Sequence, residues 1–544
     1  MPLSRPLSYA SGMSDVRVCG RTWMSDVQFG GRTWMSDLRF GCWTWMSDVR
    51  VWGGVGVKTL LRLVVVAVFQ ILISCGNVVQ AADPRPSIVV ILCDDLGAGD
   101  LSCQGHPVIR TENLDRLAAG GIRFTNFYSA APVCSPSRVG LLTGRSPNRA
   151  GIYDWIPAAA ERKPRREDAR DLVHLRRGET TLPALLKAAG YDTCLAGKWH
   201  CNSRFNNPAQ PQPGDFGFDH WFATQNNAGP SHHNPVNYVR NGQPAGPLEG
   251  YSCHLVVDEV ISWLRQRETS AETDPFFAYL AFHEPHEPVA SPPELIEQYR
   301  GAAWNSDQAE YFANVHNLDL AVGRLVQELE QLGIRQNTLI VFSSDNGPET
   351  LRRYPAGQRS WGITGGLRGM KLHTHDGGFH VAGIVNWPAK IRPGQVSAVP
   401  ASSLDLLPTC LELALVEPST ERPLDGISLV PLLQEGQIPQ RPKPLLWAYY
   451  NAINDARVAM RHGPWKVLAR LDDGKLPRFE NLTPDRLKKV QTAKLTELEI
   501  YNLEQDPGET LNLAGRGLPE EPMLAELLQQ QYQSLAADSP AWSE

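Results

Sequence analysis

Three short apolar runs stand out along the sequence, and each ends abruptly in polar residues. They span 87–93, 276–282 and 338–342 and are rich in β-branched or aromatic side chains. Uninterrupted runs of this length are typical of strands that are buried on both faces of a mostly parallel sheet. We therefore predict three central strands, each followed by side chains that are capable of chemistry.

Helical patterns occupy the stretches between these runs. Apolar positions recur at helical spacing in four segments, 111–120, 182–189, 254–265 and 317–332. Strands that alternate with helices predict an α/β sandwich built on a large, mostly parallel central sheet. Because ligands of such sheets gather at the carboxyl ends of the strands, the polar residues that end the three runs are expected to share one site.

The pattern changes after about residue 444. Short strand-like runs precede a last helical pattern there, at 445–450, 465–469, 499–503 and 522–536. Strands that are grouped together, with a helix after them, are typical of an α+β unit. We predict a catalytic domain over 84–442 and a small C-terminal α+β domain over 443–544.

The first 57 residues repeat a short unit. Met-Ser-Asp followed by Val or Leu recurs every eleven residues from Met13 onward. Units this short and this few are unlike the repeats that build solenoids, and their glycines disfavour a helix. We predict that the extension over 1–57 is not part of the mature protein.

A signal peptide is predicted over 58–82. Basic residues precede an apolar run at 63–73, which is too short for a comfortable membrane span, and small residues follow it. Cleavage after Ala81 and lipidation of Cys75 are two alternative ways for this segment to end. We expect an exported protein, periplasmic or extracellular, with no membrane span and with the lipid anchor undecided.

Charge and cysteine usage narrow the range of partners. The formal net charge of −6 gives no general attraction to nucleic acid or to an anionic membrane. The ten cysteines form neither CxxC pairs nor His/Cys ladders, so neither a zinc site nor a dense disulfide framework is indicated. An anionic substrate would have to meet a local cluster of positive groups.

Two of the predicted strands end in oxygen-bearing side chains. Asp94 and Asp95 follow the first run, and Asp345 and Asn346 follow the run at 338–342. Taken singly, an Asp pair often caps a helix, and Asp-Asn-Gly is a common turn. Together at two strand ends, they favour a site for calcium or magnesium, because both ions prefer oxygen ligands.

The segment from Cys134 to Arg145 reads as a loop that enters a helix. Pro136 suits the first turn of a helix, and Gly144 suits its end. Cys134 would then lie where backbone N–H groups and the helix dipole favour an anion. The alternative interpretation is that Cys134 is a small hydrophobic residue packed in the core.

This segment also resembles the signature of the formylglycine-dependent sulfatases, in which Cys-x-Pro-x-Arg is followed by four residues and Thr-Gly-Arg. Further segments match the family in order and extend the resemblance over about 84–515. They are Asp94-Asp95-Leu96-Gly97, Asn113-Leu114-Asp115-Arg116-Leu117, Gly197-Lys198-Trp199-His200, Gly217-Phe218-Asp219-His220-Trp221, His283-Glu284-Pro285-His286, Ser344-Asp345-Asn346-Gly347, Leu367-Arg368-Gly369-Met370-Lys371 and 501–507. Around Cys134 the sequence is similar to arylsulfatase A and N-acetylgalactosamine-6-sulfatase relatives.

One segment departs from the family pattern. Where the family commonly has Glu-Gly-Gly-x-Arg-Val-Pro, this chain has Asp-Gly-Gly-Phe-His-Val-Ala at 376–382. Lys371 and its spacing are intact. The departure therefore bears on substrate details and leaves the implied reaction unchanged.

The resemblance implies an alkaline-phosphatase-like fold and an unusual nucleophile. A maturation enzyme would oxidise Cys134 to formylglycine, whose aldehyde hydrates to a diol. One hydroxyl attacks sulfur, and the other expels sulfate by re-forming the aldehyde, which splits one hard step into two. The resemblance makes Asp94, Asp95, Asp345 and Asn346 the ligands of calcium, in preference to magnesium, with the modified Cys134 completing the shell.

The resemblance also assigns roles to the basic residues. Arg138 and Lys198 would hold the diol, and His200 would take its proton during elimination. Lys371 and His286 would grip the sulfate. Alone, each of these lysines and histidines has an ordinary structural interpretation, and only the full set of motifs in order raises them above it. The leaving alcohol would take its proton from His286 or from Asp345.

Sulfated sugars are the expected substrates, and two alternatives stay open. One is a phosphodiesterase or phosphonate-ester hydrolase of the same superfamily, some of which also use formylglycine. The other is a non-catalytic binder of sulfated glycans, which would need a broken site, whereas no expected catalytic position is missing here. The choice of sugar is expected to depend on loops such as 152–176 and 206–214.

Overall fold

The computed structural model describes residues 85–542, apart from 160–171, 271–273, 350–358, 419–420 and 480. The predicted repeat extension, the signal peptide and Cys75 lie outside the described residues. Among the residues that are described, no helix combines the length and the apolar character that a membrane span requires.

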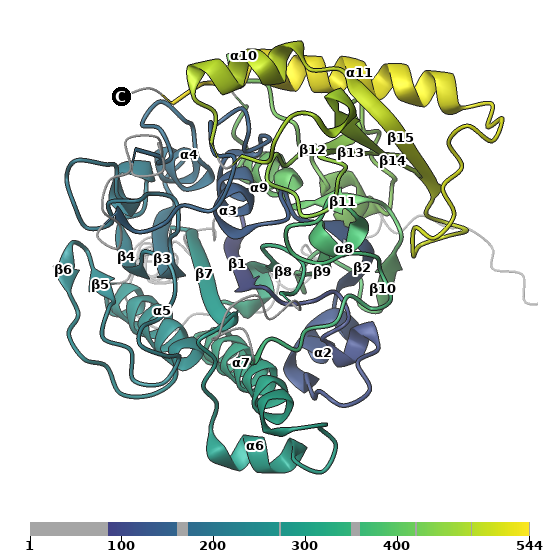
Figure 1. The fold of residues 1–544 in the computed structure, drawn as a ribbon. Helices are drawn as coiled ribbons and strands as arrows, with labels where there is room; N and C mark the ends of the chain where they lie inside the picture. The colour runs from purple at the N-terminus through teal and green to yellow at the C-terminus, as the bar shows by residue number, and fades with distance from the viewer. Residues whose placement is uncertain are drawn as a thin grey trace, which may run out of the picture. The chain divides into compact units, whose positions relative to one another are not determined.

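The central strand β1 (Ser87–Asp94) is the first predicted run, and it lies in the middle of the large sheet (Figure 1). It pairs in parallel with β7 (Phe276–Pro285) on one side and β8 (Thr338–Ser344) on the other. These are the other two predicted runs. The three strands that the hydrophobic pattern predicts are therefore neighbours, and their carboxyl ends meet at one edge of the sheet.

Eleven strands of the described chain form this sheet, in the order β10-β2-β9-β8-β1-β7-β3-β4-β5-β6, with β11 also paired to β2. The stretch from β8 to β4 is parallel, whereas β9 runs antiparallel to both of its neighbours. The remaining strands are β2 (Ile122–Tyr128), β3 (Asp192–Lys198), β4 (His220–Thr224), β5 (Val239–Arg240), β6 (Gln243–Pro244), β9 (His380–Asn386), β10 (Gln395–Ser397) and β11 (Ala401–Ser402).

Helices cover both faces of the sheet, as the alternating pattern predicts. Along β1, Val90 and Leu92 pack into one core and Val89 and Ile91 into the other, because successive side chains of a strand point to opposite faces. One core is closed by α3 (Cys134–Thr143), α4 (Leu182–Ala188) and α9 (Leu406–Leu413). The other is closed by α2 (Glu112–Ala119), α5 (Ser252–Thr269), α6 (Pro293–Tyr299) and α7 (Ser306–Gln331).

A second, antiparallel sheet follows in the order β12-β13-β14-β15. Its strands are β12 (Leu445–Ala448), β13 (Val458–His462), β14 (Trp465–Leu471) and β15 (Leu495–Asn502). In the chain, α10 (Pro484–Thr492) lies between β14 and β15, and α11 (Glu521–Ala537) follows β15. Figure 1 shows α11 along the outer side of this sheet. On its inner side, Trp447 stacks on Phe379 of α8 (Asp376–Phe379), with ring centroids 4.1 Å apart.

The fold class is therefore the predicted one, an α/β sandwich with a small α+β unit at its C-terminal end. The boundaries drawn at 84–442 and 443–544 stay a prediction. The helix expected at 317–332 begins earlier, at Ser306, because the side chain of Asn305 caps it by accepting a hydrogen bond from the backbone of Gln308. The polar sequence of this first part hid it from a search for apolar spacing.

Candidate active site

Asp94 and Asp95 reach the site because β1 ends irregularly. The pairing of β1 with β7 shifts register between Leu92 and Asp94, and Asp95 takes a left-handed backbone conformation with φ of 63°. A bulge of this kind re-aims the side chains at the end of a strand. The two carboxylates are thereby turned toward the end of the neighbouring strand β8, and both are buried.

Asp345 and Asn346 meet them from the end of β8. The backbone N–H of Asp95 donates to Oδ1 of Asp345 at 3.3 Å, and Nδ2 of Asn346 donates to Oδ1 of Asp95 at 2.6 Å. All of these residues are buried. The structure therefore brings together the four oxygen-bearing side chains that the sequence predicts as neighbours.

Cys134 enters the same centre from the start of α3. The helix begins at this residue and is capped after Thr143 by Gly144, whose backbone is left-handed, so the predicted loop-to-helix segment is confirmed. One ligand atom each from Asp94, Asp95, Cys134 and His286 lies within 4.8 Å of the others. His286, which the sequence assigned to sulfate binding, is thus also close enough to contact a metal ion.

Arg138 joins the strand ends from the inside of α3. It is fully buried, and its Nε and Nη2 donate to Oδ2 of Asp345 at 3.0 and 2.7 Å. Its Nη1 donates to the backbone carbonyl of Lys198 at 3.2 Å. Two donors of one guanidinium meet the same carboxylate oxygen, and this contact fixes the orientation of the carboxylate.

Each remaining carboxylate faces a lysine. Nζ of Lys198, at the end of β3, donates to Oδ2 of Asp94 at 2.5 Å, and Nζ of Lys371 donates to Oδ2 of Asp95 at 2.8 Å. Together with Arg138 and its partner, the centre holds three acidic and three basic side chains. The positive groups that the sequence predicts are therefore present, and each of them is paired with an acidic side chain.

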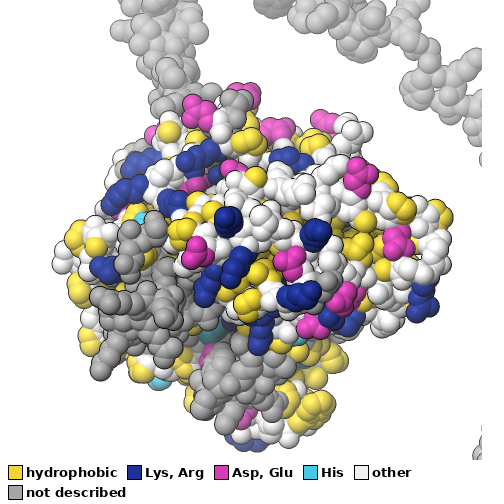
Figure 2. All heavy atoms as spheres, turned by 45° about the horizontal axis from the view of Figure 1, so that its top comes forward, with side chains coloured by type: hydrophobic (Ala, Val, Ile, Leu, Met, Phe, Trp, Pro, Cys, Tyr) yellow, Lys and Arg dark blue, Asp and Glu magenta, His cyan; other side chains and the backbone are white. Residues whose placement is uncertain are grey.

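The outer surface shows no comparable concentration on the face that can be seen. In Figure 2, the Lys and Arg side chains of the described residues are interspersed with acidic side chains.

The three carboxyl groups titrate differently because their surroundings differ. Burial alone would raise the pKa of Asp94, but Lys198, His286 and Arg138 hold it well below its usual value. Burial raises the pKa of Asp95 against the opposing charge of Lys371. Burial, followed by repulsion from Asp94, raises the pKa of Asp345 to about 7.

Two buried oxygens test whether a metal ion fits this centre. Oδ1 of Asp94 and Oδ1 of Asn346 are buried, and neither has a hydrogen-bond partner among the described residues. Unpaired buried oxygens are costly, and in a cluster of carboxylates they are suitable ligands for a hard divalent cation. The donor set therefore fits such an ion.

The hydrogen bonds of the two histidines define their tautomers. A backbone carbonyl can only accept, so Nε2 of His200 donates to Ile156 at 3.0 Å and Nδ1 of His286 donates to Glu287 at 2.6 Å. Nδ1 of His200 is buried and has no partner among the described residues, and Nε2 of His286 lies 3.6 Å from Oδ2 of Asp95. Burial, with Lys198 next, lowers the pKa of His200 well below its usual value.

The residue that follows Lys371 is fixed by hydrogen bonds of both its backbone N–H and its backbone carbonyl. The backbone N–H of Leu372 donates to the carbonyl of Pro132, two residues before Cys134, at 2.8 Å. The carbonyl of Leu372 accepts from Ile453 in the C-terminal region at 3.0 Å. Lys371 is therefore held between the segment that precedes α3 and the connection between β12 and β13 of the second sheet.

The departure from the family pattern has a structural use. Asp376 accepts from Nζ of the buried Lys466 at 2.5 Å and from the hydroxyl of Tyr128 at 2.9 Å. These contacts join α8 to β14 and β2. Asp376 is thus part of the scaffold behind the site.

Other residues near the motifs do not enter the centre. His283 is buried in a network with Thr224, Tyr238 and Ser252. His220 bonds to Glu259 near the surface, and Arg368 bonds to Tyr501. In the described chain, seven cysteines are free thiols, at positions 93, 103, 134, 194, 201, 253 and 410.

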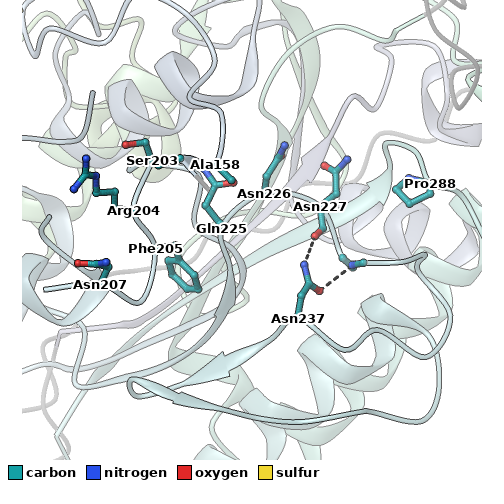
Figure 3. Close-up of a pocket in the computed structure, with 13 residues that line it drawn as sticks. Ala158, Ser203, Arg204, Phe205, Asn207, Gln225, Asn226, Asn227, Asn237 and Pro288 are labelled. Carbon is teal, nitrogen blue, oxygen red and sulfur yellow. Dashed lines mark hydrogen bonds between the residues drawn. The ribbon is translucent and has the colours of Figure 1, made fainter. Parts of the chain in front are cut away.

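Beside the centre lies a cavity that sequence reasoning located only in part, through Ala158 and Asn207 of the loops 152–176 and 206–214. It has a volume of about 780 Å³, and its lining includes Gln225, Asn226 and Asn227 (Figure 3). These residues follow the carboxyl end of β4, so the rule that located the other site residues would have found them too. Only three successive residues of β4 are apolar, between His220 and Thr224, and this run is too short for the pattern to mark a strand.

Known proteins resemble this chain over most of its length. The sequence pattern of the family described as Sulfatase matches residues 86–416. The chain is 35% identical over 387 residues to N-acetylgalactosamine-6-sulfatase of Rattus norvegicus, covering 68% of this chain and 70% of the relative. The chain belongs to the sulfatase family. This sulfatase is also 33% identical over 479 residues to arylsulfatase A of Homo sapiens, covering 82% of this chain and 86% of the relative.

A solved structure supports the fold. The sulfatase superposes on the crystal structure of Ps i-CgsB with a TM-score of 0.67 at 25% identity, covering 84% of this chain and 94% of that one. The predicted family, fold class and enzyme class are therefore confirmed, and the chain is a sulfuric ester hydrolase. The individual roles of Cys134, Arg138, Lys198, His200, His286 and Lys371, and of the four oxygen-bearing side chains, stay predictions.

Proposed function

We propose that this sulfatase is an exported enzyme that removes sulfate from sulfated sugars. Its nucleophile would be formylglycine, made from Cys134 by a maturation enzyme, and its metal would be calcium. The observation that carries this proposal is the buried centre in which Cys134, at the start of α3, lies within reach of Asp94, Asp95 and His286. The name of the relative N-acetylgalactosamine-6-sulfatase supports a sugar as substrate.

Two groups would supply the chemistry that no ordinary side chain offers. Formylglycine supplies a hydrated aldehyde, whose two hydroxyls serve in turn for attack on sulfur and for release of sulfate. Calcium, held by Asp94, Asp95, Asp345 and Asn346, supplies positive charge that favours a deprotonated hydroxyl and a polarised sulfate oxygen.

The charges of the centre suit an anionic ester. Three acidic and three basic side chains face one another there, so a bound divalent cation would add an excess of positive charge to the site. Because the site is buried, this excess is screened less than it would be in water. The ester would be attracted to the centre although the whole chain is negative.

Arg138 and Lys198 would hold the side chain at position 134 in place. Both are fully buried and anchored on carboxylates, so little reorganisation is needed when the reaction begins. His200 would move a proton at Nδ1, because its Nε2–H is committed to Ile156.

Lys371 and His286 would act on the sulfate and on the leaving alcohol. Lys371 adds a fixed cation next to Asp95. Nε2 of His286 is the nitrogen that is free to exchange a proton with the leaving oxygen, because Nδ1–H is committed to Glu287. Fixed donors of this kind stabilise the charge of the transition state more than that of the free ester.

Peptide mass spectrometry across Cys134 tests the nucleophile. In active protein from a host that contains a maturation enzyme, we expect the mass of formylglycine at this position. The variant Cys134→Ala should fold and lose turnover of an aryl sulfate, whereas Cys410→Ala, which removes a buried thiol of α9, should keep it. A fully active protein with an unmodified thiol at position 134 would overturn the mechanism.

A second assay separates the proposed reaction from its closest alternative. Rates on an aryl sulfate and on an aryl phosphodiester, measured with the same preparation, should favour the sulfate. A clear preference for the phosphodiester would instead identify a phosphodiesterase or phosphonate-ester hydrolase built on the same fold.

A further inference from the structure

Lys371 lies in a loop whose two ends are bonded to each other. At its base, the backbone N–H of Gly377 donates to the carbonyl of Arg368 at 2.8 Å. Leu372, directly after the lysine, has φ of 68°, a left-handed conformation that residues other than glycine adopt at a cost. Such strain persists only where the surrounding structure holds the backbone in place. The Lys371 loop, residues 368–376, therefore needs support from outside itself.

Glu509 of the C-terminal region bonds to both ends of this loop. Nη1 of Arg368 donates to the backbone carbonyl of Glu509 at 3.0 Å, and the backbone N–H of Asp376 donates to Oε2 of Glu509 at 2.8 Å. Nη1 of Arg368 also donates to the hydroxyl of Tyr501, on β15, at 3.0 Å. One residue, 133 positions beyond Asp376 in the chain, thus bridges the start and the end of the Lys371 loop.

The position of Glu509 is unfavourable for a glutamate. Its φ is 51°, where a glycine would avoid the steric cost of a side chain, and its side chain is fully buried. Burial raises the pKa of this carboxyl group to about 7, against the opposing charge of Lys466. A side chain that is held in place against two such costs indicates that its contacts have a use.

Pairing with Lys466 does not account for Glu509. Nζ of Lys466 already donates to Oδ1 of Asp376 at 2.5 Å, which neutralises this buried cation, and it lies 3.8 Å from Oε1 of Glu509. Oε1 has no hydrogen-bond partner among the described residues, whereas Oε2 accepts from the loop. Within the described chain, the hydrogen bond of the Glu509 carboxyl group is therefore the one to the Lys371 loop.

We propose that Glu509 is a positioning residue for Lys371. By bridging the two ends of the loop it keeps the loop closed, and it thereby holds the ammonium group of Lys371 at the sulfate. The inference rests on the proposed function, in which Lys371 binds sulfate, and deepens it by naming the residue that keeps this ligand in place. It also gives a use to the C-terminal motif at 501–507, because Tyr501 bonds to the same loop and the turn after the motif carries Glu509.

Binding of inorganic sulfate to the mature enzyme, measured by calorimetry, tests the proposal. Glu509→Gly removes the carboxyl group and also the steric cost of the left-handed backbone. Because these effects on stability oppose each other, Tm should change by less than about 4 °C, while the Kd for sulfate should rise about tenfold. Glu509→Gln keeps an oxygen that can accept from Asp376, so the Kd should rise less than about threefold.

Glu497→Gly is the matched control. Glu497 of β15 is also a left-handed glutamate, with φ of 48°, but it is exposed and its ion pair is with Arg470 of β14. This substitution should leave the Kd for sulfate unchanged within about twofold. A rise as large as in Glu509→Gly would show that the bridge to the loop is not the cause, and would overturn the proposal.

A second background shows whether Glu509 acts through Lys371. Lys371→Gln keeps a donor for Asp95 but loses the cation, and it should itself raise the Kd for sulfate about tenfold or more. In this background, Glu509→Gly should have no further effect, because the group that it positions is gone. An equal effect in both backgrounds, or an unchanged Kd in Glu509→Gly alone, would refute the inference and leave the proposed function standing. Unchanged sulfate binding in Lys371→Gln would contradict the proposed role of Lys371, and the inference with it.

Discussion

At the scale of single residues, Gly197 shows how tightly Lys198 is built into the sheet. Its φ is +110°, in a region that residues other than glycine avoid. A Cβ at this position would lie 1.9 Å from the backbone oxygen of Ala281 in β7. The two strands approach more closely at this point than any side chain would allow. That approach places the next residue, Lys198, beside Asp94.

Replacement of this glycine should therefore be far more costly than replacement of an open one. Gly197→Ala must strain its own backbone and displace β7, so we expect a loss of stability above about 3 kcal/mol together with loss of activity. Gly190→Ala is the matched control: its φ is +84°, but nothing lies within 4 Å of the added carbon. It should cost only about 1–2 kcal/mol. Urea unfolding measures both, and equal midpoints would contradict the argument from close approach.

At the scale of elements, the second sheet supports the catalytic centre through one buried cation. Lys466 of β14 is fully buried and donates to Asp376 of α8, and its Nζ lies 4.2 Å from the ring centroid of Phe379. Lys371 precedes α8 by only five residues. The small sheet thus supports the segment that carries Lys371, a proposed sulfate ligand.

Two substitutions on the same strand separate this buried pair from a surface pair. Lys466→Met leaves the carboxylate of Asp376 without its buried cation and should cost about 3–5 kcal/mol and most of the activity. Arg470→Met breaks ion pairs with Asp455 and Glu497, but Arg470 is partly exposed, so the cost should be at most about 1 kcal/mol. Thermal unfolding and aryl sulfate turnover give the comparison. A Lys466 variant that is as stable as the Arg470 variant would show that the buried ion pair is not needed to support this segment.

The central strands and their ends could be predicted because hydrophobic runs mark them directly. Asp94 and Asp345 were found in this way, and Cys134 through its motif and the helix that begins there. Asn226 and Asn227 were not, since β4 is short and its apolar pattern is weak. The bond between Lys466 and Asp376 joins residues 90 positions apart, and no local pattern along the sequence reveals such a pair.

At the scale of the whole molecule, the proposed metal would link binding to folding. Its ligands come from β1, β8 and the start of α3, which are separated by up to about 250 residues in the chain. The unfolded chain has no such arrangement of oxygens. An ion that binds only the folded state therefore raises the free energy of unfolding.

Calcium should accordingly stabilise chelator-treated protein in a concentration-dependent manner. At one hundred times its Kd, the ion should add about 2.7 kcal/mol, visible as a higher Tm by calorimetry. Magnesium should have a smaller effect, because it holds its water more tightly and accepts fewer geometries. In Asn346→Ala, which lacks the unpaired Oδ1, the shift should largely disappear. A Tm that ignores calcium, or an undiminished shift in the variant, argues against a metal site here.

The backbone carbonyls of Ile156 and Glu287 each accept two hydrogen bonds, one from a histidine of the site and one from an amide of the segment 225–227. Along 225–227, the first and third amides are tied to the backbone behind the catalytic histidines, while the acceptor of Asn226 between them is not tied to the protein. Substitution of Asn226 should therefore leave both carbonyls, and the histidines that bond to them, undisturbed. Loss of the amide at position 225 or 227 would instead remove a donor from a carbonyl that also holds His200 or His286, so its effect should be the same whatever the substrate.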